Sequence, residues 1–332
     1  MVEIQSIIRE LTHSCVAGRV LATLVSVEGS SYRRPGARLL LKPDRTRIGS
    51  ISGGCLEEDL IARALQVAEN GEATLVTYDT TLENDLVWGV GLGCHGVVKI
   101  LLERLPSRPL WAERLAENFL HCRPTSLRVI WAATDINRLG TSLAAPETKL
   151  PAGTSAFDEN LLPPVRLAIF GAGDDAQPLA KMAKDVGWHV SVADPRAEFV
   201  TLARFPSADA LVVAPAAELV ARTNPPADSL AVVMTHRYVQ DVPILRGLCN
   251  RPLAYLGLLG PKKRADQIIL ELRADGPSTG LDRLAQLHAP VGLDLGAETP
   301  EEVALSIVAE MRATLANRDG RPLRERKRPI HG

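Results

Sequence analysis

The sequence lacks any apolar run approaching the roughly 20 residues that a membrane-spanning helix requires. Its first residues, MVEIQSIIREL, alternate apolar and charged side chains as an amphipathic helix does. They lack the continuous apolar core of a signal peptide. These absences predict a cytoplasmic protein that does not associate with membranes.

Paired cysteines and an excess of one charge are also missing. The formal net charge is -1, which gives no reason to expect a nucleic-acid partner. The cysteines are odd in number, widely scattered and free of any Cys-x-x-Cys pair, which argues against a disulfide framework and a structural zinc site. They are Cys15, Cys55, Cys94, Cys122 and Cys249.

The chain has 332 residues, enough for two domains. Residues 1–150 are interpreted as a first α/β domain, with strands over 20–29, 37–44, 73–79 and 97–105 and a helix from 56 to 70. The proline- and glycine-containing stretch 151–164 is interpreted as a linker. Residues 165–332 alternate apolar strands with helices, which predicts a C-terminal Rossmann-type domain with a parallel sheet.

A dinucleotide-binding fingerprint opens the second domain. Gly171 and Gly173 follow an apolar strand, Ala176 opens a helix, and Asp194 ends the next strand, where a ribose-binding acid is expected. Asp174 and Asp175 would repel a bound diphosphate, so a role as helix caps is the alternative. NAD(P) is therefore a doubtful ligand.

A cluster of cations follows a later strand of the same domain. Lys262, Lys263 and Arg264 lie at the start of a predicted helix, and this combination suits an anion. The alternative is a solvated helix start with no ligand.

An arginine-rich turn joins two strands of the first domain. Arg33, Arg34 and Arg38 lie within six residues, and guanidinium groups suit bidentate recognition of phosphate or carboxylate. The pattern favours an anion site over the alternative of a tight polar hairpin turn.

Two glycine-rich turns of the first domain contain a thiol. Gly53 and Gly54 precede Cys55, which lies near the start of a predicted helix, where a thiolate is stabilised. This makes Cys55 the candidate metal ligand, against the alternative of an inert buried cysteine. Cys94 lies in a second such turn, and the two thiols share one cavity only if the fold brings them together.

These motifs, in this order, resemble the XdhC/CoxI family of accessory factors for molybdenum hydroxylases. The matching stretches are VEGSSYRRPGARLLL, GSISGGCLEEDL, DLVWGVGLGCHGVVKILLE, IFGAGDDAQPLA, MTHRYVQDVPILRGL, YLGLLGPKKR and HAPVGLDLGAETPEEVALSI. The resemblance implies a protein that binds the molybdenum cofactor, supports its sulfuration by a cysteine desulfurase and hands it to a xanthine dehydrogenase-type apo-enzyme. It assigns cofactor binding to Cys55. Two positions depart from the family pattern, since Ser52 replaces a common glycine and Asp174 replaces a frequent histidine.

The sequence therefore favours a cofactor-insertion chaperone, expected as a homo-oligomer, over a catalyst. The rival is an NAD(P)-dependent oxidoreductase using the Rossmann domain, although no Tyr-x-x-x-Lys proton-transfer signature accompanies that domain. A non-catalytic nucleotide sensor or assembly module is a third alternative.

Overall fold

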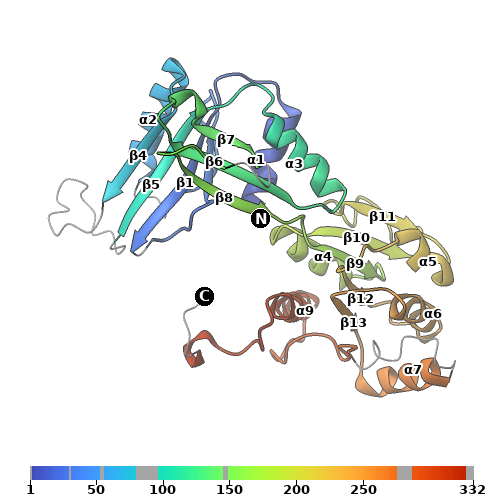
Figure 1. Cartoon of the computed structure of the whole chain (residues 1–332). Coiled ribbons are helices and arrows are strands. Elements are labelled where there is room, and N and C mark those ends of the chain that lie inside the picture. Colours follow the sequence, from blue (N-terminus) through green and yellow to red (C-terminus); the bar gives the residue numbers. More distant parts are fainter. Residues whose placement is uncertain are drawn as a thin grey trace. The chain divides into compact units, whose positions relative to one another are not determined.

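The computed structural model describes residues 2–29, 31–52, 56–79, 96–144, 149–274 and 286–326. It divides the chain into two compact units, residues 1–163 and 164–332 (Figure 1). Within the described ranges, no helix combines the length and apolarity needed to cross a membrane.

The first unit is built on antiparallel sheets. A five-stranded sheet has the order β3-β2-β1-β5-β4, and a three-stranded sheet has the order β7-β6-β8. Its elements are α1 (Val2–His13), β1 (Val20–Gly29), β2 (Arg38–Leu41), β3 (Arg47–Gly49), α2 (Glu57–Asn70), β4 (Thr74–Asp79), β5 (Gly96–Arg104), α3 (Leu110–Leu120), β6 (Thr125–Ala132), the 3-10 turn η2 (Ile136–Arg138), β7 (Gly140–Leu143) and β8 (Ser155–Leu161).

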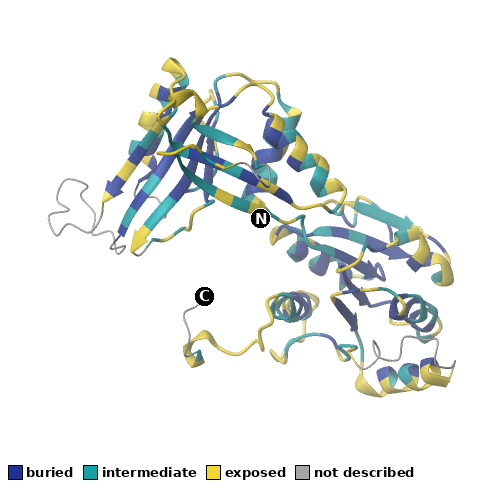
Figure 2. Cartoon of the chain, viewed as in Figure 1, coloured by how far each residue is buried: buried dark blue, intermediate teal, exposed yellow. Residues whose placement is uncertain are grey.

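Alternation along β1 explains how the five-stranded sheet is covered. Val20, Ala22 and Leu24 face the core beneath α2, whereas Leu21 faces the core formed with α1 and α3. Both sets are buried (Figure 2). A strand with apolar residues on both faces needs helices or a second sheet on each side, and the first unit supplies them.

The second unit is an open parallel sheet with strand order β11-β10-β9-β12-β13. The predicted Rossmann-type α/β fold is confirmed here. Helices α4 and α9 pack on one face and α5, α6 and α7 on the other. The elements are β9 (Arg166–Phe170), α4 (Ala176–Asp185), β10 (His189–Asp194), β11 (Ala210–Val213), α5 (Ala216–Thr223), β12 (Leu230–Val233), α6 (Tyr238–Cys249), β13 (Tyr255–Leu258), α7 (Lys262–Ala274), α9 (Pro300–Leu315) and the 3-10 turn η3 (Leu323–Glu325).

The prediction of a linker over residues 151–164 is wrong for most of that stretch. Residues 155–161 form β8, which pairs along β6 and belongs to the first unit. The sequence of this strand shows little apolar alternation because it lies at a sheet edge and is only partly buried. The boundary between the units falls instead between Pro163 and Pro164.

Candidate functional site

The glycine turn of the second unit begins directly after β9. Gly171 has φ 122°, and a Cβ at this position would lie 2.5 Å from the backbone oxygen of Met234. Only glycine fits both the conformation and this close approach. Gly173 has no such constraint, since an added Cβ would meet only the flexible carboxylate of Asp175, at 2.9 Å.

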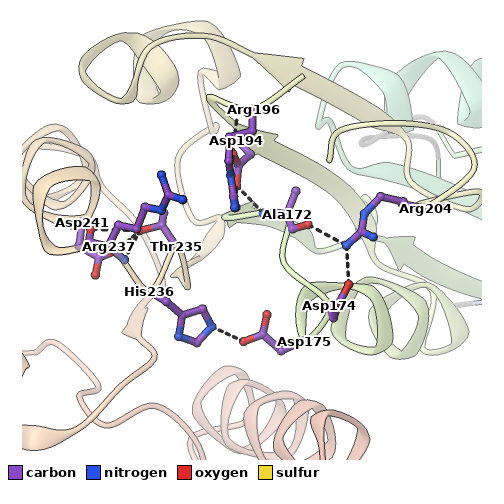
Figure 3. A network of polar contacts seen from close by, with 10 residues as sticks. All are labelled: Ala172, Asp174, Asp175, Asp194, Arg196, Arg204, Thr235, His236, Arg237 and Asp241. Carbon is purple, nitrogen blue, oxygen red and sulfur yellow. Dashed lines mark hydrogen bonds and ion pairs between the residues drawn. The ribbon is translucent and has the colours of Figure 1, made fainter. Parts of the chain in front are cut away.

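Asp194, the expected ribose-binding acid, is fully buried and already saturated (Figure 3). Its Oδ2 accepts hydrogen bonds from the Ala172 N–H and Arg196 Nη2, both at 2.8 Å. Its Oδ1 accepts from the N–H and Nε of Arg196, both at 2.9 Å. Burial alone would raise the pKa of Asp194, but these hydrogen bonds outweigh it and lower the pKa. In this arrangement the carboxylate has no capacity left for a ribose hydroxyl.

Neither aspartate of the glycine turn acts as a side-chain cap for α4. Asp174 Oδ1 accepts a hydrogen bond from Arg204 Nη2 at 2.8 Å, and the same guanidinium nitrogen lies 3.2 Å from the Ala172 oxygen. Asp175 Oδ2 lies 2.5 Å from His236 Nε2. Arg204 therefore offsets the charge of Asp174, and His236 engages Asp175, so the saturation of Asp194 is the stronger obstacle to a dinucleotide.

A second polar group lies next to His236, and the sequence reasoning missed its link to Asp241. Thr235 Oγ1 donates to Asp241 Oδ1 at 2.6 Å, and Arg264 Nη2 lies 3.4 Å from Asp241 Oδ2. Asp241 is fully buried, and that burial raises its pKa. The signal in the sequence was the short spacing between Thr235, which follows a strand, and Asp241, which lies at the start of the next helix. Arg264, expected to face an anion with its neighbouring lysines, is instead held inside by this contact.

The arginine turn of the first unit divides its cations into paired and unpaired groups. Arg33 Nη1 donates to Glu3 Oε1 at 3.0 Å, and buried Arg38 is paired with Glu159. Arg34 is exposed and has no side-chain partner within the described part of the chain. Of the three predicted anion ligands, Arg34 is therefore the one that is available without breaking an ion pair.

A cavity of about 250 Å³ opens beside this turn. Its walls come from the start of α1, the turn itself and the end of β8. The lining residues are Glu3, Ile4, Arg33, Arg34, Pro35, Gly36, Ala37, Arg38 and Leu161. The cavity is large enough to hold a phosphate group.

The predicted thiol turn lies mostly outside the described residues, which exclude Gly53, Gly54, Cys55 and Cys94. The described residues on either side of this turn are hydrogen-bonded to each other. The Ser52 N–H donates to Glu57 Oε1 at 2.9 Å, the Ser52 hydroxyl donates to the same carboxylate, and the Leu56 N–H donates to Ser52 Oγ at 3.3 Å.

Glu57, at the start of α2, is a residue that the sequence reasoning missed. Its side chain is buried, and although burial would raise its pKa, the hydrogen bonds from Ser52 outweigh this and lower it. Its position two residues after Cys55 was the available signal. Ser52, the departure from the family glycine, supplies the hydroxyl of this contact. No cluster of three or more His, Cys, Asp or Glu side chains suited to a metal occurs among the residues with a described placement.

Comparisons with known proteins follow both units. Residues 17–79 match the model of the XdhC and CoxI family, and residues 167–311 match the XdhC Rossmann domain. A Bacillus subtilis protein, named as a probable subunit of xanthine dehydrogenase, is 35% identical over 88% of this chain and 92% of its own length. The molybdenum cofactor insertion chaperone PaoD of Escherichia coli is 27% identical over 89% of this chain and 82% of its length.

A solved structure shows the same arrangement of elements. The crystal structure of a xanthine dehydrogenase from Bacillus halodurans has a TM-score of 0.77 and 31% sequence identity to this chain. The similarity covers 96% of this chain and 97% of that one. The chain belongs to the XdhC and CoxI family.

Proposed function

We propose that this chain is an accessory protein that binds the molybdenum cofactor and supports its insertion into a xanthine dehydrogenase-type hydroxylase. The observation that carries the proposal is the match over most of both chains to PaoD, which is named a molybdenum cofactor insertion chaperone. Sulfuration of the cofactor by a cysteine desulfurase, and self-association of the chain, belong to the same proposal and rest on the family resemblance.

The arginine turn supports a contact with the anionic end of this cargo. Molybdopterin carries a phosphate, and the cavity beside Arg34 has room for one. Arg34 offers a guanidinium with no described partner, and Arg33 could join it if the phosphate displaced Glu3. Arg38 is buried in its pair with Glu159, so we assign it a structural role in this proposal.

The thiol of Cys55 is proposed to contact the metal or its sulfur. A thiolate is a good ligand for soft metals, and the position just before α2 favours the ionised form. The Ser52–Glu57 contact supports this assignment because it fixes both flanks of the glycine turn. Cys94 is the second candidate.

The test is to purify the full chain from a molybdenum-replete host and to measure bound pterin and metal. Cys55→Ser should lower both by about tenfold or more, because a hydroxyl is a poor soft-metal ligand. Cys249→Ser is the matched control, since Cys249 is a buried core residue of the second unit. Wild-type pterin and metal content in Cys55→Ser would contradict the thiol assignment.

A second pair of variants tests the anion contact. Arg34→Ala should lower pterin retention about tenfold, which corresponds to one charge-assisted bidentate contact. Arg138→Ala removes another exposed arginine of the same unit, in η2, and should leave retention unchanged. Equal losses in the two variants would indicate nonspecific attraction rather than a site.

The same proposal expects nicotinamide nucleotides to bind weakly. Asp194 is already bonded to Arg196 and to the turn backbone, so a ribose would have to break these contacts. Calorimetric titration of the full chain with NAD and NADP measures this directly. Sub-micromolar binding would restore the oxidoreductase alternative.

A further inference from the structure

The strand order of the second unit reverses between β9 and β12, at a place that the proposed function does not use. The chain passes from β9 to β10 and β11 on one side, then returns to β12 and β13 on the other. Open parallel sheets bind ligands beyond the carboxyl ends of the strands at such a reversal. The turns that flank it here are residues 171–175, after β9, and residues 235–237, after β12.

Backbone atoms hold the two turns together at their base. The Met234 N–H donates to the Phe170 oxygen at 2.7 Å, and Gly171 lies so close to Met234 that no Cβ fits between them. A side-chain contact adds a second link between the turns. His236 Nε2 and Asp175 Oδ2 lie 2.5 Å apart and join the turns (Figure 3).

Both partners depart from their ordinary local geometry. His236 has φ 58°, which is uncommon for a residue other than glycine. Asp175 occupies the N-cap position of α4, where an aspartate usually accepts a hydrogen bond from the helix, yet its side chain makes no capping bond. The contact between the turns has taken precedence over both local preferences.

The base of the His236 turn is anchored independently of Asp175. The Arg237 N–H donates to Thr235 Oγ1 at 3.1 Å, and Thr235 is bonded to Asp241 at the start of α6. His236 can therefore lose Asp175 without losing the fold of its own turn. The contact is a bridge between two held turns rather than a support for either.

Charges from three helices face the imidazole. The hydrogen bond to Asp175, at the start of α4, is the largest influence and raises the pKa of His236. Partial burial and Arg264, on α7, lower it, whereas Asp241, on α6, raises it further. A raised folded-state pKa means that the bridge contributes fully below about pH 6.5, the unfolded value, and is lost as the pH rises through the folded value.

We propose that the His236–Asp175 pair is a pH-dependent latch between the turns after β9 and β12. It reinforces the contact between these turns while the imidazole is protonated, and the contact weakens when the imidazole is neutral. The latch is independent of cofactor binding in the first unit.

The first test follows the histidines of the full-length chain by NMR as the pH is varied. One of the seven histidine resonances should vanish in His236→Gln, which assigns it. Its titration midpoint should move down in Asp175→Asn, because that variant removes the carboxylate but keeps the size of the side chain. Asp174→Asn is the matched control, since the neighbouring Asp174 bonds to Arg204 and not to His236.

The second test measures opening by hydrogen exchange of the amides in residues 171–176 and 234–240. Between about pH 6 and about pH 8, wild-type exchange should rise about threefold beyond its intrinsic pH dependence, the factor expected for a partly exposed ion pair. Asp175→Asn and His236→Gln should abolish this excess, and Asp174→Asn should keep it. An unmoved His236 midpoint in Asp175→Asn, or an excess that persists in that variant, would overturn the latch.

Discussion

The arginine turn of the first unit and the glycine turn of the second both concentrate charge, but they use it differently. In the first, Arg33 and Arg38 are paired and Arg34 has no partner among the described residues. In the second, Asp194 and Asp174 are paired with arginines and Asp175 is paired with His236. A paired charge must break its pair before it binds a ligand, so the number of charges in a motif overstates its binding capacity. The first turn keeps one charged side chain, Arg34, that can bind a ligand without breaking an ion pair to a described residue.

The strongest test of this comparison replaces a paired arginine and an unpaired arginine of the first turn in two separate variants. Arg38→Met leaves Glu159 unpaired in a mostly buried position and should lower the free energy of unfolding by about 3 kcal/mol. Arg34→Met should change it by less than about 0.5 kcal/mol. Urea denaturation of both variants measures the difference. Similar losses would show that Arg34 is also structural.

A smaller effect is expected in the glycine turn of the second unit. Gly171→Ala places a Cβ against the Met234 backbone in a left-handed conformation and should cost roughly 2 to 3 kcal/mol. Gly173→Ala meets only the end of the Asp175 side chain and should cost less than about 1 kcal/mol. The shift of the urea midpoint separates them. A mild Gly171→Ala would mean that the turn rearranges easily.

Acid sensitivity should distinguish the second turn from the first. Asp194→Asn replaces a charged acceptor of several hydrogen bonds and should lower stability by about 2 kcal/mol at neutral pH. Because the folded pKa of Asp194 is lowered, its contribution is present above about pH 4, the unfolded value, and is lost as the pH falls through the folded value.

The wild-type and Asp194→Asn stabilities should therefore converge in acid, as measured by urea unfolding at a series of pH values. Asp185→Asn, which removes an exposed pair with Lys181, is the control and should show little difference at any pH. A constant gap between wild type and Asp194→Asn down to low pH would contradict the assigned ionisation.

The smallest expected effect concerns helix capping. Thr299 caps α9 and accepts a hydrogen bond from the Glu302 N–H, so Thr299→Ala should cost about 1 kcal/mol in urea denaturation. Asp175, at the equivalent position of α4, makes no such bond. At a pH where His236 is neutral, Asp175→Ala should therefore cost less than Thr299→Ala. An equal cost would show that Asp175 does cap its helix.

The two units also differ in how much the sequence could predict. The strands, the glycine turn and the acid at Asp194 in the second unit are local signals, and the parallel fold follows from them. In the first unit, helix α3 and strands β3 and β8 were missed. β8 is an edge strand with little apolar alternation, so only its pairing with β6 reveals it.

The partners of charged residues were beyond sequence reasoning in both units. Arg38 and Glu159 are 121 residues apart, and His236 and Asp175 are 61 apart. Residue types and spacing identify which groups are chemically capable, but the fold decides which of them neutralise one another. The proposed role of Cys55 still rests on family resemblance and position because it lies outside the described residues.

The late position of β8 has a consequence for how the protein is made. The 121 residues between Arg38 and Glu159 take roughly 6 to 24 s to synthesise. Throughout that interval Arg38 lacks its carboxylate partner, and the smaller sheet of the first unit lacks β8. A nascent chain released or cleaved before residue 161 would expose an unpaired, normally buried guanidinium, which makes this stage a point of vulnerability to chaperone capture or proteolysis.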